Sequence, residues 1–341
     1  MRKIIVFRTD RIGEVLLSTV AVDALKRKYP EAAVTFATSG YSRPIVENRR
    51  DLAEILTIDV RGGASWMMEA VRLGVLLRKK RFDMALVLNP HKVLHLACFL
   101  AGIPERVGYD RKWGALLTKK MPDLKEKGEK HEIEYTKDLL EFAGIECGEL
   151  SPRLPLSAEA EKNVSAMIRK EGLDSAPLVA IHPGSSNPAK IWPCERYTEL
   201  ASRIKTETGC NVVILGSREE KPIGEKITRG SEGASVDLTG RLDLSELAAL
   251  LNRAVLFVGN DNGPMHMAAA LGVKVIAIFG RNIPGASPRR WRPWGGKHIV
   301  FHENPACRPC YDPGCPYDHR CFKAVSASAV FSAVKDMLAR K

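Results

Sequence analysis

Three short polar stretches carry residues that could bind an anion or move a proton. The first, residues 8–14 (RTDRIGE), ends in Glu14, a carboxylate in the first turn of an expected helix. A carboxylate there is stabilised as an anion and could act as a general base toward an acceptor hydroxyl. The alternative is that Glu14 only complements the helix dipole. With one glycine instead of three, the stretch is not a dinucleotide-binding GxGxxG fingerprint.

The second stretch, residues 182–193 (HPGSSNPAKIWP), has the composition of a phosphate-binding loop. Gly184, Ser185 and Ser186 could supply backbone and hydroxyl donors, and Lys190 could supply a positive charge. The stretch is not a Walker A loop, which requires GxxxxGK[ST]. A polar loop without a ligand is the alternative.

The third stretch, residues 258–266 (VGNDNGPMH), joins an apolar run to a second expected helix. Gly263 and Pro264 place a tight turn and a proline at the helix start, which leaves backbone N–H groups available for an anion. Asp261 could accept hydroxyls of a sugar or ribose. His266 could contact a phosphate, although a histidine at such a position can equally be a packing residue.

The eight cysteines fall into two groups. Four are isolated and are expected to be reduced thiols, mostly buried. The other four are close enough in sequence to encircle a zinc ion or an iron–sulfur cluster, and they are Cys307, Cys310, Cys315 and Cys321. Their spacing matches neither a common ferredoxin nor a zinc ribbon, so a disulfide or free thiols are alternatives to a metal site.

Each polar stretch follows a predicted strand, and predicted strands alternate with predicted helices along the chain. This alternation indicates α/β domains with parallel sheets covered on both faces. The first series of predicted strands is Ile4–Phe7, Val34–Ala37, Ile55–Asp59 and Met84–Leu88. The second series is Leu178–Ile181, Val212–Leu215, Val236–Leu238, Val255–Val258 and Val275–Phe279.

The segment Ser151–Pro155 (SPRLP) is predicted to be an extended connector between two domains, because its prolines disfavour a helix. We therefore predict domains at residues 1–155 and 156–341. Between residues 108 and 131 lysines are frequent and apolar residues few, which predicts an irregular basic loop. Two doubly wound domains would place the carboxyl ends of their strands around a shared cleft.

The chain has 52 Lys and Arg against 40 Asp and Glu, a net charge of +12 over 341 residues. This charge predicts an anionic partner. Nucleic acid is not expected, because aromatic residues make up only 6% of the chain and no binding signature is present. No apolar run is long enough to span a membrane and no secretory signal is evident. We expect a cytoplasmic protein with peripheral contact to the inner membrane face.

These stretches, in this order, resemble glycosyltransferase family 9, the ADP-heptose heptosyltransferases of lipopolysaccharide core assembly. The resemblance rests on FRTDRIGEVLLST, HPGSSNPAKIWP, GNDNGPMHMAAALGVKVIAIF and the tail CRPCYDPGCPYDHRCF. It implies the GT-B fold, with two Rossmann-like domains facing a central cleft. It also implies inverting transfer of a heptose from ADP-heptose to a lipopolysaccharide inner-core acceptor, with no required cofactor.

The resemblance also assigns roles to individual residues. Glu14 takes the position of the catalytic base, which is usually Asp in the family. Lys190 matches the lysine on the donor phosphates, and Ser185 and Ser186 match its neighbouring hydroxyl residues. The donor-binding turn matches at Asp261, Asn262, Gly263 and His266. At the position of Asn262 the family more often has Thr. A carboxylate that holds the ribose matches at Glu219, with Glu220 as the alternative.

Three other functions remain open at this stage. The same fold could use another nucleotide sugar or acceptor, a choice that Glu14 and Asn262 leave undecided. The chain could bind nucleotide or nucleic acid without catalysis. The cysteine cluster could serve as a redox or metal sensor. Three basic segments would favour an anionic, lipid-linked acceptor at a membrane, and these are Arg78–Arg81, Lys112–Lys130 and Arg289–Arg292.

Overall fold

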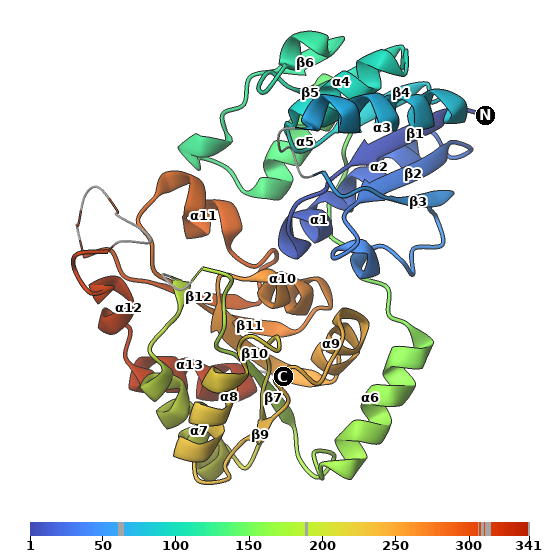
Figure 1. Cartoon of the computed structure of the whole chain (residues 1–341). Coiled ribbons are helices and arrows are strands. Elements are labelled where there is room, and N and C mark those ends of the chain that lie inside the picture. Colours follow the sequence, from blue (N-terminus) through green and yellow to red (C-terminus); the bar gives the residue numbers. More distant parts are fainter. Residues whose placement is uncertain (61–64, 188–189, 306, 308–309, 311–314, 340–341) are drawn as a thin grey trace. The chain divides into compact units, whose positions relative to one another are not determined.

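A computed structural model describes residues 1–60, 65–187, 190–305, 307, 310 and 315–339 (Figure 1). The chain divides into two compact units, Met1–Pro155 and Leu156–Lys341. Each unit contains one six-stranded sheet whose strands are all parallel. The predicted α/β class is therefore confirmed.

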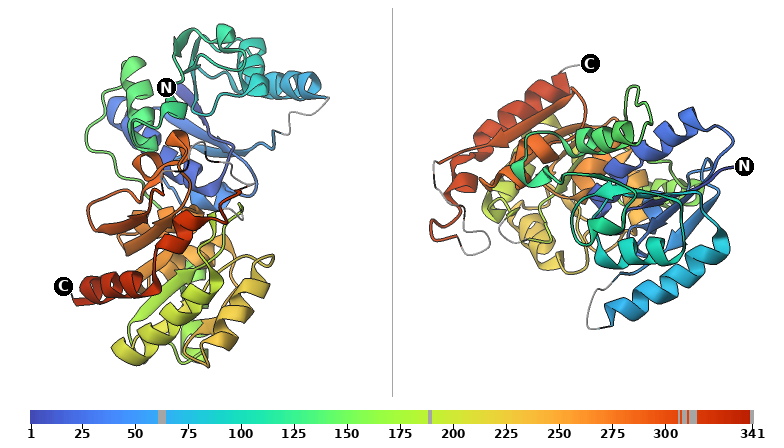
Figure 2. Two further views of the ribbon diagram at one scale, coloured as in Figure 1. Left: turned by 90° about the vertical axis from the view of Figure 1, so that its left-hand side faces the viewer. Right: turned by 90° about the horizontal axis from the view of Figure 1, so that it is seen from above.

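The first unit begins with a strand and two short helices and ends with helix α5. Its elements are β1 (Lys3–Phe7), α1 (Ile12–Ser18), α2 (Val20–Lys28), β2 (Ala33–Thr38), η1 (Arg43–Ile45), β3 (Glu54–Thr57), α3 (Trp66–Lys80), β4 (Met84–Val87), α4 (Lys92–Leu100), β5 (Glu105–Tyr109), η2 (Gly114–Leu116), β6 (Lys119–Met121), η3 (Lys125–Lys127) and α5 (Glu132–Phe142). Helices α3 and α4 pack side by side in this unit (Figure 2).

The second unit repeats this alternation and ends in a helix that packs on α7. Its elements are α6 (Ala158–Lys170), β7 (Leu178–His182), α7 (Cys194–Thr208), β8 (Asn211–Ile214), α8 (Lys221–Gly230), β9 (Val236–Asp237), α9 (Leu244–Leu251), β10 (Ala254–Asn260), α10 (Gly263–Ala270), β11 (Lys274–Phe279), η5 (Pro284–Ala286), α11 (Pro288–Trp291), β12 (His298–His302), α12 (Arg320–Ala324) and α13 (Ala327–Ala339).

Both sheets have the same strand order relative to the chain. The first is β3-β2-β1-β4-β5-β6, and the second, read from its other edge, is β9-β8-β7-β10-β11-β12. The winding direction therefore reverses between β1 and β4 in one unit and between β7 and β10 in the other. Ligands of doubly wound sheets bind at the carboxyl ends of the strands at this reversal. The three polar stretches follow β1, β7 and β10.

Strand β1 shows why these residues form a central strand. Ile4, Ile5, Val6 and Phe7 are all fully buried, so both faces of the strand are covered, as the uninterrupted apolar run requires. Helix α3 can approach α4 closely because Gly74 lacks a side chain. A Cβ atom at Gly74 would lie 3.1 Å from Cβ of Leu100 and 3.2 Å from the carbonyl oxygen of Ala97.

Two sequence predictions about the first unit are wrong. The region predicted as an irregular basic loop contains strand β6 and two 3-10 turns. Its lysines also make internal ion pairs, since Lys119 Nζ lies 2.8 Å from Glu105 and the buried Lys125 Nζ lies 2.8 Å from Glu132. The apolar residues from Val15 to Leu25, whose spacing predicts a single helix, lie in two helices, α1 and α2, which meet at Thr19.

No helix in the described residues is long and apolar enough to cross a membrane.

Candidate functional site

Glu14 lies in the first turn of α1, directly after the loop that follows β1. Burial raises the pKa of its carboxyl group, and the nearby Asp10 carboxylate raises it further. Arg8 and Arg11 oppose this shift only in part. A carboxyl group whose pKa is raised is better matched to proton transfer near neutral pH than an ordinary glutamate.

A buried ion network holds the loop that carries Glu14. The Arg8 guanidinium donates to Asp10 at 2.7 Å and to Glu132 at 3.0 Å, and Lys125 donates to the same Glu132 oxygen at 2.8 Å. Glu132 is fully buried, so removal of either cation would leave a poorly compensated charge. Sequence reasoning did not single out Glu132 or Lys125, because nothing in their local pattern shows that they meet Arg8.

The loop after β4 meets the loop after β1, as expected for the two strands at the reversal. Asn89 donates through Nδ2 to the Thr9 hydroxyl at 3.1 Å. The Ser42 hydroxyl donates to the Asp10 carbonyl oxygen at 3.1 Å. The first unit therefore presents a polar, carboxylate-containing surface at the carboxyl ends of β1 and β4.

In the second unit, Asn262 joins the two predicted anion-binding loops. Its Oδ1 accepts from Met265 N at 3.0 Å and so caps helix α10. Its Nδ2 donates to the Gly184 carbonyl oxygen at 3.0 Å and lies 3.1 Å from Nδ1 of His182. An amide can cap the helix and still donate two hydrogen bonds, whereas the hydroxyl of a threonine can cap the helix and donate only one. The structure thus gives asparagine a specific task at this position.

Lys190 and Asp261 make a second connection between these loops. The Lys190 ammonium forms an ion pair with the Asp261 carboxylate, and the two side chains are only 13% and 9% exposed. In the same loop Ser185 is half-buried and Ser186 is exposed, while Pro188 and Ala189 lie outside the described residues. Gly263, which the sequence placed in the donor-binding turn, is the first residue of α10.

Asn260 is an organising residue that sequence reasoning missed. Its Oδ1 accepts from Trp192 N at 3.1 Å and from the Tyr197 hydroxyl at 3.0 Å, and its Nδ2 donates to the Pro183 carbonyl oxygen at 2.6 Å. The side chain is fully buried at the end of β10. Asn260 could have been found from the sequence because it is an amide at the end of an otherwise apolar run. A buried amide needs several hydrogen-bond partners, so such a residue is expected to connect neighbouring segments.

Of the two candidate ribose carboxylates, Glu220 lies beside the predicted phosphate loop. Its Oε2 is 3.8 Å from Nε2 of His182, and a Cβ atom at Gly184 would overlap its carboxylate. Burial lowers the pKa of His182, although Glu220 opposes this shift. Glu219, the residue chosen from the sequence, is exposed. The position of Glu220 therefore makes it the stronger candidate.

His266 lies in the first turn of α10 and is buried. Its ring is 6.3 Å from the Trp291 ring in an edge-on arrangement. His266 thus makes a ring contact of the kind expected for the packing role, one of the two roles that the sequence left open.

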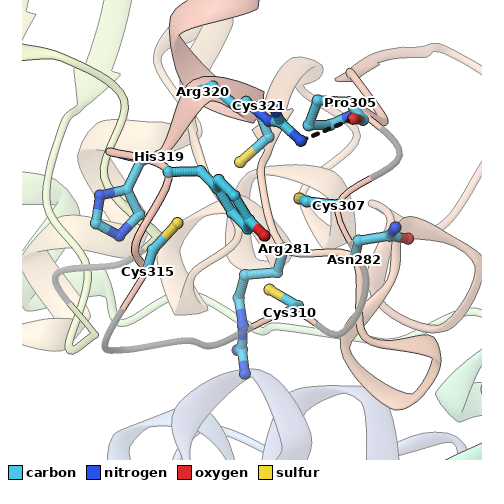
Figure 3. A pocket seen from close by; sticks show the side chains of 10 residues that line it. Arg281, Asn282, Pro305, Cys307, Cys310, Cys315, His319, Arg320 and Cys321 are labelled. Atoms are coloured by element: carbon cyan, nitrogen blue, oxygen red, sulfur yellow. Dashed lines mark hydrogen bonds between the residues drawn. The ribbon is translucent and has the colours of Figure 1, made fainter.

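The cysteine cluster lies around a small cavity in the second unit (Figure 3). The sulfur atoms of Cys307, Cys310, Cys315 and Cys321 point toward its centre, and the cavity volume is about 20 Å³, room for an ion or a water molecule. Burial raises the pKa of Cys321, and the other three cysteines raise it further. Within the described residues, no three His, Cys, Asp or Glu side chains are arranged to hold a metal ion.

His319 also lines this cavity. Its Nε2 is buried, and no described residue donates to it or accepts from it. Several residues between the cysteines lie outside the described residues, namely 306, 308–309 and 311–314. The four thiols and this imidazole are borderline-soft donors of the kind that zinc and iron prefer.

The chain was compared with known proteins. The model of glycosyltransferase family 9 (heptosyltransferase) matches residues 70–320. Lipopolysaccharide heptosyltransferase 2 of Salmonella typhimurium is 30% identical over 84% of this chain and 85% of its own length.

Three solved structures share the fold. A family 9 glycosyl transferase from Veillonella parvula has a TM-score of 0.86 at 21% identity, with 100% of this chain and 98% of that chain covered. ADP-heptose lipopolysaccharide heptosyltransferase II of E. coli has a TM-score of 0.81 at 24% identity, with 99% and 98% covered. An iron-containing dodecameric glycosyltransferase from enterotoxigenic E. coli has a TM-score of 0.60 at 15% identity, with 98% and 76% covered.

The family match covers more than half of the chain. The chain is a glycosyltransferase of the GT-B fold and belongs to glycosyltransferase family 9, the heptosyltransferases.

Proposed function

We propose that this enzyme transfers a heptose from ADP-heptose to an anionic inner-core lipopolysaccharide acceptor, with inversion at the anomeric carbon. The Salmonella relative is named for this pathway, and the E. coli structure is named for this donor. One observation supports the proposal most strongly: Asn262 and the Lys190–Asp261 ion pair connect the loop after β7 to the loop after β10. This arrangement suits a nucleoside diphosphate.

The diphosphate would be bound by three kinds of group in the second unit. Backbone N–H groups and hydroxyls at Ser185 and Ser186, the amino end of α10 at Gly263, and the Lys190 ammonium all favour phosphate oxygens. In the structure the Lys190 charge is matched by Asp261. A diphosphate carries more negative charge than Asp261 and would compete for the ammonium. The same groups would stabilise the ADP that leaves.

Glu14 is the proposed general base. It would accept the proton of an acceptor hydroxyl while that oxygen bonds to the anomeric carbon. The bond from that carbon to the diphosphate oxygen breaks in the same step, and its electron pair leaves with ADP. One displacement inverts the configuration. The raised pKa of Glu14 suits this task, because the carboxylate becomes a stronger base.

A donor panel tests the proposal. ADP-heptose, ADP-glucose, UDP-glucose and GDP-mannose would each be supplied with a deacylated inner-core acceptor, and the released nucleotide would be measured. We expect rapid ADP release from ADP-heptose and an inverted product by proton NMR. Preference for another nucleotide sugar would support the alternative donor, and a retained configuration would contradict the single displacement.

We also propose that the cysteine cluster holds one structural metal ion, with iron the first candidate. The four cysteines line one cavity, and the solved relative described as iron-containing supplies the choice of metal. Cys307, Cys310, Cys315 and Cys321 would be the ligands, with His319 as an alternative donor. The bound ion would tie the tail to the second unit and takes no part in the proposed displacement.

Elemental analysis of protein purified without oxygen tests this second proposal. About one iron or zinc per chain is expected, with loss of the metal in Cys307→Ser and Cys321→Ser but not in Cys147→Ser, which lies in the other unit. Metal-free protein with four titratable thiols in the tail, or a disulfide found by mass spectrometry, would contradict the proposal.

A further inference from the structure

Helix α3 exposes apolar side chains on the face that points away from its own unit. Met67, Met68, Val71 and Val75 are 57%, 56%, 51% and 52% exposed. The buried side of the same helix is formed by Ala70, Leu73, Gly74 and Leu77, which lie on the side of α4. The helix therefore has two apolar faces, and only one of them is covered. A solvent-facing helix surface normally carries polar residues.

The apolar surface continues beyond α3 onto its neighbours. Leu100 of α4 is 40% exposed and lies next to Gly74. At the other end of α3, the rings of Trp66 and Trp113 meet edge to face with centroids 5.0 Å apart, and Trp113 is half exposed. Lys92 Nζ lies 4.4 Å from the centroid of the Trp66 ring. Tryptophan and lysine together are typical of residues at the boundary between lipid and water.

The charges around this surface are positive. Arg72, Arg78 and Lys79 are exposed on α3, and Arg81 follows the helix. In the part of the chain that the structure describes, no ion pair involves Arg72, Arg78 or Lys79. The acidic residue of α3 is Glu69, in its first turn. Cationic side chains beside exposed apolar ones match an anionic lipid surface in both charge and hydrophobicity.

We propose that the exposed face of α3, with Trp66, Trp113 and Leu100, binds the surface of an anionic bilayer. We call this set, with Arg72, Arg78 and Lys79, the α3 surface. A second copy of the chain fits less well, because a two-fold contact through α3 would bring the same three cations together. The apolar side chains would enter the headgroup region while the cations contact lipid phosphates.

The α3 surface refines the expected membrane contact of the chain. That expectation named three basic segments, Arg78–Arg81, Lys112–Lys130 and Arg289–Arg292. In the second segment, Lys119, Lys120 and Lys125 make ion pairs within the first unit. The α3 surface keeps Arg78 and Lys79 of the first segment, which have no ion pair among the described residues, and adds apolar side chains beside them. This inference rests on the proposed function in one respect: a lipid-linked acceptor would require the enzyme to bind at a membrane.

Vesicle flotation of the full chain tests this proposal. The vesicles would contain either phosphatidylcholine alone or phosphatidylglycerol and phosphatidylethanolamine. We expect binding to the anionic vesicles only, weakened by salt. Arg72→Gln/Arg78→Gln/Lys79→Gln should weaken it by roughly 100-fold, since each cation near such a surface contributes about fivefold. Lys162→Gln/Arg169→Gln/Lys170→Gln on α6 is the matched control and should bind like the wild type.

An apolar variant separates this contact from simple charge attraction. Met67→Ser/Val71→Ser/Val75→Ser should lose most binding at unchanged charge, while Val255→Ser, a 41% exposed valine of the other unit, should not. Equal binding of all variants to the anionic vesicles would overturn the proposal. It would also be overturned if the wild type were a dimer and these substitutions dissociated it without changing flotation. ADP release with a water-soluble acceptor should be unchanged in every variant, so a failure of the proposed function would be seen independently.

Discussion

The carboxyl ends of β1 and β4 in one unit and of β7 and β10 in the other occupy the same place in the same winding, yet they carry opposite chemistry. The first presents the carboxylates of Asp10 and Glu14. The second presents an ammonium, the amino end of α10 and an amide cap. The fold supplies two equivalent positions, and in the proposed function their side chains assign proton transfer to the first and phosphate binding to the second.

The two positions also differ in how their charges are balanced. In the first unit, Arg8 is held by Asp10 and the buried Glu132, while burial and the nearby Asp10 carboxylate raise the pKa of Glu14. In the second unit, Lys190 is matched by Asp261. A single counter-ion is easier to replace by a ligand than a buried network. This difference suits the proposed roles, in which the first site holds a base in place and the second exchanges the Asp261 carboxylate for a diphosphate.

The largest expected effect comes from removing the base. Glu14→Gln keeps the size of the side chain and should lower kcat by roughly 10²- to 10⁴-fold, the usual contribution of general base catalysis. Glu14→Asp, the residue more frequent in the family, should retain much of the rate. The kcat of both variants is measured from steady-state ADP release. A Glu14→Gln enzyme with a kcat close to that of the wild type would contradict the assignment of Glu14 as the general base.

A smaller effect should follow from removing the phosphate-binding cation. Lys190→Ala should lower kcat/KM for ADP-heptose by roughly 10²- to 10³-fold, as for loss of one group that stabilises developing negative charge. Lys190→Arg should recover part of this loss, because the charge is kept. Asp261→Asn should bind ADP at least as tightly as the wild type if diphosphate replaces the carboxylate. Isothermal titration with ADP would show whether it does.

The pH dependence should distinguish the two positions further. The wild-type rate should rise as Glu14 loses its proton, with a midpoint above the ordinary glutamate pKa of 4.5, and Glu14→Gln should lack this limb. A raised folded-state pKa means that ionised Glu14 opposes folding. Glu14→Gln should therefore raise the melting temperature at a pH well above that pKa and should not raise it at pH values low enough to protonate Glu14. Equal melting temperatures at the higher pH would contradict the buried-carboxylate interpretation.

The smallest effect concerns the nucleoside. Glu220→Gln should weaken ADP binding by about tenfold, as expected for loss of a hydrogen bond to a charged acceptor, while Glu219→Gln at the exposed neighbouring position should leave it unchanged. Titration of the two variants at one pH is enough. The opposite order would restore the assignment made from the sequence.

The sequence predicted the elements whose apolar runs are unambiguous, such as β1 and β10. Strands β5, β6 and β12 were missed because their residues are half polar, as ERVGY, KKM and HIVFH show. Helix α13 was not anticipated either. Motifs located the loops around Glu14, Lys190 and Asn262. The choice between Glu219 and Glu220 could not be made from adjacent identical residues, because only the backbone turn decides which carboxylate lies against Gly184.

Contacts between buried residues that lie far apart in the chain could also not be predicted from a single sequence. Arg8 meets Glu132 across 124 positions, and Asn260 meets Trp192 across 68. Such pairs depend on how strands are ordered in the sheet. The exposed face of α3 depends on tertiary packing in the same way, since α4 covers only one side of this helix.

The division of labour between the two positions is tested most directly by measuring the dissociation constant of ADP-heptose together with the single-turnover rate in Glu14→Gln. The account predicts donor affinity close to that of the wild type and a transfer rate reduced by at least about 100-fold. Transfer at the wild-type rate, or a loss of donor affinity that accounts for the lost turnover, would contradict it.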